Sequence, residues 1–283
     1  MSNEPVADYY DASTSRFLFV GGSGRSLAMH RPLWTDGIAN AEQAAGHING
    51  VIRHLAESIL GGAPDRVVDL GCGVGGTMFH LALCWRDTAF VGLTISGAQV
   101  RRGAAESQAR GLANRCRLVQ ADFTRPVDAF PANLVIAIES HVHAASLAEF
   151  LTAVRRHLEP GGVLLVVDDM LVRPEADLSR TETRWLAAFR KGWRLGHVPD
   201  RDGFMASARA VGFDVVEMQD LTPFVRLNRL RDRVLHVVGP VADRIGLNRW
   251  PLFGNMIGGD GLTRSYRLGI MGYTLVALRL RGD

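Results

Sequence analysis

Residues 67–76 read VVDLGCGVGG, and residues 77–83 that follow them read TMFHLAL. A short apolar run rich in valine breaks into alternating glycines and continues into good helix formers, which predicts a strand, a tight turn and a helix. Glycine at every second position permits positive φ angles and lets a ligand approach the backbone closely. The helix then offers its N-terminal N–H groups and the positive end of its dipole to an electron-rich group. The stretch therefore predicts a nucleotide-type cofactor site.

The glycine spacing alone leaves the identity of the cofactor open. Gly71, Gly73 and Gly75 form G-x-G-x-G behind Asp69, and Gly76 also completes the G-x-G-x-x-G of dinucleotide sites. The string DLGCGVGG resembles the first motif of class I S-adenosylmethionine (SAM)-dependent methyltransferases. That resemblance implies SAM as the cofactor, with Asp69 contacting its methionine part and the three alternating glycines forming the floor.

Composition excludes several classes of protein. The 283 residues are 47% hydrophobic with a net charge of +3, which is too small to indicate nucleic acid as a partner. No apolar run reaches membrane length, and the start at Met1 has neither a basic segment nor an apolar core, so we expect a soluble cytoplasmic protein. Cys72, Cys84 and Cys116 lack ligand spacing, which argues against disulfides and a bound metal. A small-molecule substrate is expected, and a homo-oligomer is left open.

Apolar strands alternate with helical segments along the rest of the chain. This alternation predicts an α/β fold with a parallel sheet covered on both faces and a ligand at the carboxyl ends of its strands. The resemblance implies a Rossmann-like sheet of seven strands, the last one antiparallel, with a mainly helical substrate cap. Strands are expected at 67–70, 90–94, 117–121, 134–138, 163–167, 213–218 and 267–280, with a turn at 159–162 and helices near 39–60, 77–83, 96–109, 147–158, 176–196, 201–210 and 223–248.

The expected domain organisation places cap segments around a discontinuous core. The segments are an N-terminal helical cap at 1–62, a SAM-binding α/β core at 63–172, a cap insertion at 173–204, core again at 205–222, a helical cap insertion at 223–265 and the final core strand at 266–283.

The ends of the second and third strands carry the next candidate cofactor residues. Residues 92–99 read GLTISGAQ, without the acid that most class I methyltransferases use to hold the ribose. This string resembles a subset that includes cyclopropane synthases and the sterol, tocopherol and prenyl C-methyltransferases. Thr94 and Gln99 can hydrogen-bond ribose as neutral groups, while Ser96 is expected to be a helix N-cap. Carried over by position, Asp122 and Phe123 line the adenine pocket, with Phe123 as a plain core residue the alternative.

The string ESHVH at 139–143 follows the fourth strand. C-methylation of an alkene leaves a carbocation that must lose a proton, and a carboxylate is a suitable acceptor. The string resembles the Glu-Ser and His pattern of tocopherol and prenyl diphosphate C-methyltransferases, so Glu139 is our candidate catalytic base; the alternative is that it only binds cofactor or substrate. His141 and His143 are candidates for metal ligation, diphosphate contact or O-methyl general base, with a structural role the alternative. We assign His143 to catalysis and His141 to substrate binding.

The expected cap supplies the remaining candidates. Tyr10, in the Tyr-Tyr-Asp opening common in the resembled subset, is expected to close over SAM. A sulfonium methyl and a carbocation both favour aromatic faces, and a diphosphate needs cations. The expected substrate-binding residues are Arg16, Arg25, His30, Trp34, His141, Trp185 and Phe224. Mg²⁺ is expected, if at all, only as a bridge between substrate phosphate oxygens, because no dedicated protein cage is evident.

These residues lead to one functional hypothesis with two alternatives. The hypothesis is SAM-dependent methylation of an alkene carbon of an isoprenoid, specifically a prenyl diphosphate such as isopentenyl, geranyl or farnesyl diphosphate. The first alternative is an O- or N-methyltransferase of a natural product with a histidine base. The second is a SAM- or NAD-binding protein without transfer chemistry.

Overall fold

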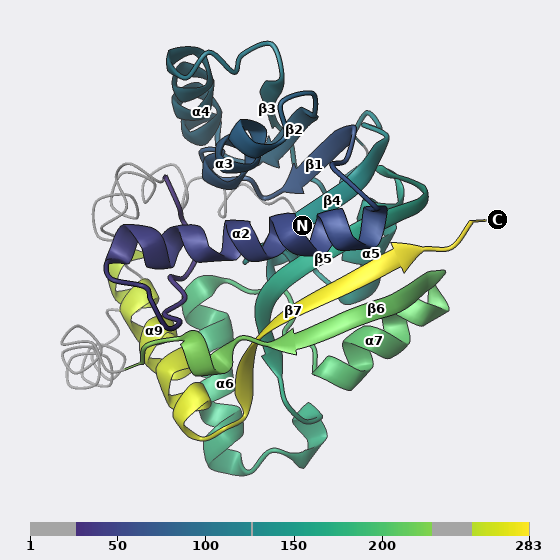
Figure 1. The fold of residues 1–283 in the computed structure, drawn as a ribbon. Coiled ribbons are helices and arrows are strands. Elements are labelled where there is room, and N and C mark those ends of the chain that lie inside the picture. Colours follow the sequence, from purple (N-terminus) through teal and green to yellow (C-terminus); the bar gives the residue numbers. More distant parts are fainter. Residues whose placement is uncertain (1–26, 126, 228–250, 283) are drawn as a thin grey trace.

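The computed structural model describes residues 27–125, 127–227 and 251–282 (Figure 1). Its centre is a seven-stranded sheet in the order β3-β2-β1-β4-β5-β7-β6, in which β7 runs antiparallel to both of its neighbours. The predicted α/β fold with a reversed last strand is therefore confirmed. The strands are β1 (Arg66–Leu70), β2 (Ala89–Thr94), β3 (Cys116–Gln120), β4 (Ala132–Ile138), β5 (Leu158–Leu171), β6 (Phe213–Asp220) and β7 (Met271–Leu280).

Helices cover both faces of this sheet. The first face packs against α2 (Ala41–Leu60), α3 (Gly76–Cys84) and α4 (Gly97–Ala109), and the second packs against α5 (Leu147–Arg155) and α7 (Arg201–Ala210). Strand side chains alternate between the two cores: Val67 lies in the first core and Val68 in the second. This alternation is what an apolar parallel strand buried on both faces requires.

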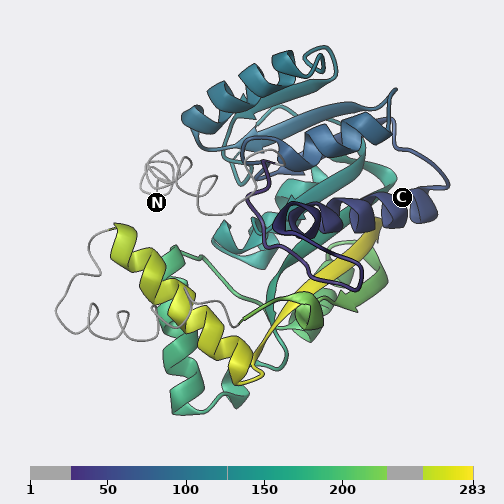
Figure 2. The same cartoon turned by 60° about the vertical axis from the view of Figure 1, so that its left-hand side comes forward.

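Two helices stand apart from the sheet. They are α6 (Arg180–Trp193) and α9 (Pro251–Arg267), which pack against each other in both ribbon views (Figures 1 and 2). A Cβ on Gly192 would lie 2.4 Å from the backbone nitrogen of Gly258, so glycine permits this close approach. Helix α7 begins at Arg201 and crosses the expected boundary between residues 204 and 205, and its Phe204 is fully buried in the second core.

Several of the expected element bounds are wrong. The helix expected at 147–158 ends at Arg155, and the helix expected at 176–196 spans only Arg180–Trp193. Most of the helix expected at 223–248 lies outside the described residues. The expected final strand from residue 267 begins only at Met271, because α9 continues to Arg267 and ends in a turn with Gly269 at φ +68°. There the N–H of Ile270 donates to the carbonyl of Ser265, the pattern of a Schellman cap. The expected turn at 159–162 lies within β5 as an interruption of its pairing, since Leu158 pairs with Ala132 and the register resumes at Val163 with Leu134.

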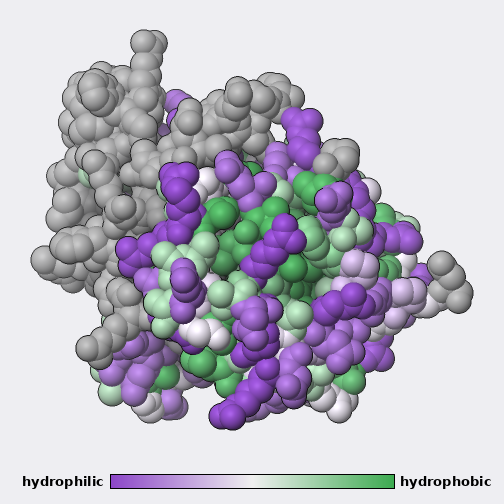
Figure 3. Space-filling view, turned by 90° about the horizontal axis from the view of Figure 1, so that it is seen from above, coloured by the Kyte–Doolittle hydropathy of each residue, from purple (hydrophilic) through white to green (hydrophobic). Residues whose placement is uncertain are grey.

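The connection from β3 to β4 is irregular in its described residues, unlike the helical connections elsewhere. Val91 and Val119, on the second face of β2 and β3, are accordingly half-buried against the second core. Figure 3, seen from above Figure 1, shows apolar side chains gathered in the middle of that end of the molecule within a polar surround. Short 3₁₀ turns complete the fold at His141–His143, Glu175–Asp177 and Thr222–Phe224. Within the described residues, no helix is long and apolar enough to cross a membrane.

Candidate active site

The glycine turn connects β1 to α3 as predicted. Gly71 has φ +82°, and a Cβ there would lie 2.4 Å from the Cβ of Ser140 at the end of the neighbouring strand β4. Gly75, at φ +89°, is the N-cap of α3 and brings no capping side chain. The turn is therefore a backbone surface, with Gly73 between these two glycines and the helix N-terminus beside it.

Asp69 lies at the end of β1 and is almost fully buried. Burial raises the pKa of its carboxyl group to about 7, because an ionised carboxylate is poorly solvated there. A cationic group bound next to it would favour the charged form. The position suits the ammonium of an amino-acid moiety.

The end of β2 holds the two neutral residues predicted for the ribose. The hydroxyl of Thr94 donates to Oε1 of Gln99 at 2.5 Å, and the hydroxyl of Ser96 accepts from the backbone N–H of Gln99 as the expected N-cap. Nε2 of Gln99 reaches the sulfur of Met29 at 3.9 Å. That sulfur would also lie 2.8 Å from a Cβ on Gly73, so Met29 covers the glycine turn. No sequence motif predicted this contact.

The end of β3 is less open than expected. Oδ1 of Asp122 accepts from the backbone N–H and the hydroxyl of Thr124, at 3.0 and 2.7 Å, as in an Asx turn. Phe123 is buried in the second core, edge to face with Phe150. These contacts are those of a turn residue and a core residue, and the adenine role of both stays a prediction.

Glu139, at the end of β4, is held in an unusual conformation. Its φ of +50° lies in the left-handed region, which non-glycine residues rarely adopt. Its Oε1 accepts from the backbone N–H of Arg31 at 2.7 Å and from the hydroxyl of Tyr273 at 2.8 Å. Burial raises the pKa of this carboxyl above its usual range, although Arg31 opposes the shift. Glu139 is thus a half-buried, oriented carboxyl group with a raised pKa, as a general base requires.

The guanidinium of Arg31 lies beside Glu139 in an enclosure of acid and aromatic groups. Both terminal nitrogens donate to the carboxylate of Asp169 at 2.5 Å, and Nη1 also approaches the hydroxyl of Tyr266 at 2.8 Å. Its central carbon lies 5.0, 5.6 and 5.9 Å from the ring centres of Tyr273, Tyr266 and Trp193 respectively. Four separate parts of the chain therefore meet around one cation.

His141 faces the second core of the protein. Its Nδ1 lies 2.7 Å from Oδ2 of Asp168, and its fully buried ring packs against Phe150, Phe204 and His197. The contacts of His141 are those of a structural residue. His143 is half-buried, and burial lowers its pKa below the usual range, which favours the neutral imidazole.

The other expected substrate residues are scattered. Burial lowers the pKa of His30 to about 4, and the backbone N–H of Trp34 donates to the carbonyl of Phe224, which ties two expected cap segments together. Trp185 lies on α6 with the guanidinium of Arg264 4.2 Å from its ring centre. Tyr10, Arg16 and Arg25 lie outside the described residues.

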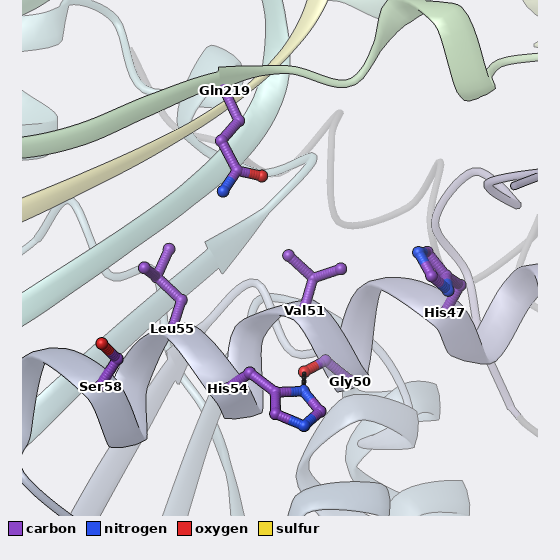
Figure 4. Close-up of a pocket in the computed structure, with 7 residues that line it drawn as sticks. All are labelled: His47, Gly50, Val51, His54, Leu55, Ser58 and Gln219. Carbon is purple, nitrogen blue, oxygen red and sulfur yellow. Dashed lines mark hydrogen bonds between the residues drawn. The ribbon is translucent and has the colours of Figure 1, made fainter.

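A separate pocket lies between α2 and β6 (Figure 4). Its volume is about 560 Å³, and Gln219 reaches toward α2 from β6. None of the predicted site residues and none of the residues of the glycine turn lines it. Within the part of the chain that the structure describes, no three His, Cys, Asp or Glu side chains are grouped to hold a metal.

Comparison with known proteins agrees with this geometry. A family model described as a methyltransferase domain matches residues 67–162. The sterol 24-C-methyltransferase of Yarrowia lipolytica is 30% identical over 218 residues, which cover 75% of this chain and 54% of that protein. The chain spans about half the length of the curated relatives it matches.

Two solved structures show the same fold over nearly the whole chain. The [4+2]-cyclase SpnF has a TM-score of 0.75 at 23% identity, with 100% of this chain and 98% of that chain covered. The geranyl diphosphate C-methyltransferase from Streptomyces coelicolor A3(2), solved with S-adenosyl-L-homocysteine, has a TM-score of 0.69 at 16% identity, with 98% and 97% covered. Residues 67–162 thus match a methyltransferase domain, and the strand order and the glycine turn give this chain the Rossmann-like sheet of class I methyltransferases.

Proposed function

We propose that this protein is a SAM-dependent C-methyltransferase that methylates an alkene carbon of an isoprenoid. The observation that carries the proposal is Glu139, a half-buried carboxyl group with a raised pKa and one oxygen engaged by two donors. The next residue, Ser140, lies against Gly71 of the glycine turn. A carbocation formed by methylation of an alkene must lose a proton, and this carboxyl group is suited to take it. The similarity to sterol C-methyltransferases supports the same chemistry.

The residues of the turn fit the proposed cofactor. Gly71, Gly73 and Gly75 leave backbone where side chains would intrude, and Asp69 is a buried carboxyl group whose raised pKa suits a cationic partner. SAM supplies an electrophilic methyl group on a positively charged sulfur. We propose that Asp69 holds its ammonium and that Thr94 and Gln99 hold its ribose.

The chain's own contribution to the reaction would be orientation, shielding and proton removal. Because Oε1 of Glu139 accepts both hydrogen bonds, the other oxygen, Oε2, is the one we assign to the proton. Tyr266, Tyr273 and Trp193 surround the neighbouring Arg31 with aromatic faces, which also favour a transient carbocation. Contact between donor and acceptor in a closed site would supply much of the rate.

Prenyl diphosphates are the first acceptors that we propose, with Arg16 and Arg25 as the cations that would bind the diphosphate; Mg²⁺, if required, would enter with the substrate and balance its charge. An uncharged isoprenoid, such as a sterol with a side-chain alkene, is the second candidate. It is favoured by the pairing of Arg31 with Asp169, which leaves that guanidinium already engaged by a carboxylate, and by the sterol C-methyltransferase relatives. The two acceptors differ in the charge that the site must balance.

The proposal is tested with purified protein, methyl-labelled SAM and a panel of isopentenyl, geranyl and farnesyl diphosphates, sterols, phenols and amines. Labelled methyl on an alkene carbon of an isoprenoid is the expected result, and the productive acceptors decide between diphosphate and uncharged substrates. Activity confined to phenols or amines would contradict C-methylation. Binding of a nicotinamide nucleotide in place of SAM would contradict the cofactor assignment.

A further inference from the structure

We infer that Arg31 is a positioning residue that orients Glu139 and places a positive charge beside it, through a main-chain contact to Glu139 and a side-chain contact to Asp169. This inference rests on the proposed function, because it concerns the base of that reaction. Arg31 stands in the segment before α2, more than 100 residues from both acids in the sequence. It contacts the ends of β4 and β5 together, which no local motif brings about.

The two contacts of Arg31 have different geometric effects. Its backbone N–H donates to Oε1 of Glu139 at 2.7 Å, which selects one carboxylate oxygen as acceptor. Its guanidinium forms a two-point contact with Asp169 at 2.5 Å, which fixes the residue in both position and rotation. The backbone donor is therefore held in place by the side chain of the same residue.

The surroundings keep the guanidinium where it is. The aromatic rings of Tyr273, Tyr266 and Trp193 come from β7, α9 and α6, and all lie within 6 Å of its central carbon. The side chain of Asp169 is 2% exposed and that of Arg31 is 16% exposed. A charged pair with so little exposure is weakly screened by water, so Arg31 acts strongly on nearby groups.

The charges around Glu139 then decide its protonation. Burial raises the pKa of Glu139, and Asp169 and Asp168 on β5 raise it further, whereas Arg31 lowers it by its charge and its backbone N–H. Tyr273 on β7 also faces the carboxyl as a hydrogen-bond donor, and Tyr266 on α9 lies close to the same group. Removal of Arg31 withdraws the positive charge and leaves the negative charges of Asp169 and, on the other face of the sheet, Asp168 to act on Glu139. Without Arg31 the pKa of Glu139 would rise further, which would leave less of the carboxylate form that a base requires.

The test follows the ionisation of Glu139 directly in the full chain, by ¹³C NMR of protein labelled at the glutamate carboxyl carbons. Glu139→Gln identifies the signal by its loss. Arg31→Met should raise the midpoint of the Glu139 titration by about one pH unit or more, the usual effect of losing one close opposite charge. Arg31→Lys should recover part of this shift, because it keeps the charge but not the two-point contact.

Arg190→Met is the matched control. Arg190 binds Glu175 through two nitrogens at 2.7 Å, but this pair lies on α6 and the turn before it, without a described contact to Glu139. An unchanged midpoint in Arg31→Met, or an equal shift in Arg190→Met, would overturn the inference. If Arg31→Met does not fold, Arg31→Gln, which lacks the positive charge, is compared with Arg31→Lys, which keeps it. Equal Glu139 midpoints in these two variants would overturn the inference.

The acidic limb of the kcat profile provides the second readout and should move upward with the NMR midpoint. If the protein methylates an isoprenoid but loss of the Arg31 charge does not shift the titration midpoint of Glu139, the proposed function stands and this inference is wrong. If the titration midpoint of Glu139 depends on Arg31 but the protein methylates no isoprenoid, the inference about the charge stands and the proposed function is wrong.

Discussion

Asp168 and Asp169 are neighbours in β5, yet their carboxylates point to opposite faces of the sheet. Asp168 pairs with His141 among the aromatic residues of the second core, whereas Asp169 pairs with Arg31 beside Tyr266 on the first face. The alternation of side chains along a strand is sufficient to produce this separation. One acid thus supports the fold behind the site, and the other supports the site itself.

Asp168→Ala should lower the free energy of unfolding by about 3–5 kcal/mol, because it leaves His141 buried without the partner of a buried pair. The matched control is Asp214→Ala, whose pair with Arg281 has side chains 50% and 62% exposed and should cost less than about 1 kcal/mol. Urea unfolding of both variants measures the difference. Equal losses would show that the Asp168–His141 pair contributes no more than a surface pair.

Glu139→Gln should bind SAM like the wild type while its turnover falls about 100- to 10,000-fold, the usual range for loss of a general base. The glutamine keeps the size of the side chain and an acceptor oxygen for Arg31 and Tyr273 but cannot take up the proton. Calorimetry with SAM and single-turnover transfer measure the two effects separately. Glu217→Gln, on β6, is the control and should retain wild-type turnover. A turnover in Glu139→Gln equal to that of the wild type would remove Glu139 from the mechanism.

Gly71→Ala should destabilise the protein more than Gly111→Ala. Both residues have positive φ angles, +82° and +69°, so both alanines carry a backbone cost of about 1–2 kcal/mol. A Cβ on Gly111 meets nothing within 4 Å, whereas one on Gly71 would lie 2.4 Å from the Cβ of Ser140, and overpacking adds about 1–3 kcal/mol. Urea unfolding of the two variants isolates the contact. If the two losses are equal, the close approach of β1 and β4 at this point does not constrain the turn.

SAM affinity should rise several-fold between pH 6 and pH 7.5. The folded-state pKa of Asp69 is raised to about 7, so the ligand-free protein loses this proton across the same range, and a bound ammonium favours the ionised form. The same shift makes the stability of the free protein fall as pH rises from about 4 to about 7, because the unfolded carboxyl ionises first. Asp69→Asn should bind SAM more weakly and remove this pH dependence. Calorimetric titration with SAM across this pH range measures both the loss of affinity and the loss of its pH dependence. If the affinity of Asp69→Asn for SAM still depends on pH, another group causes that dependence.

Much of the fold could be predicted because its signals are local. The glycines between residues 71 and 76, the apolar strands and Ser96 as an N-cap each depend on neighbouring residues, and the structure confirms them. The bounds that were wrong lie where tertiary pairing overrides local pattern. Leu158 joins β5 before the glycine turn at 161–162, and α9 extends into the segment expected to be strand.

The candidate site divides in the same way. The sequence determined that Asp69, Thr94, Asp122 and Glu139 lie along one edge of the sheet, because parallel strands present their carboxyl ends together. Only the tertiary structure decided that Arg31 and Tyr273 complete this edge. Arg31 arrives from a segment before the first strand, and Tyr273 arrives because β7 runs in reverse, so that its first residues rather than its last reach the site. Contacts between residues more than 100 positions apart leave no periodicity or spacing to read, and they are specified only when the whole sheet has assembled.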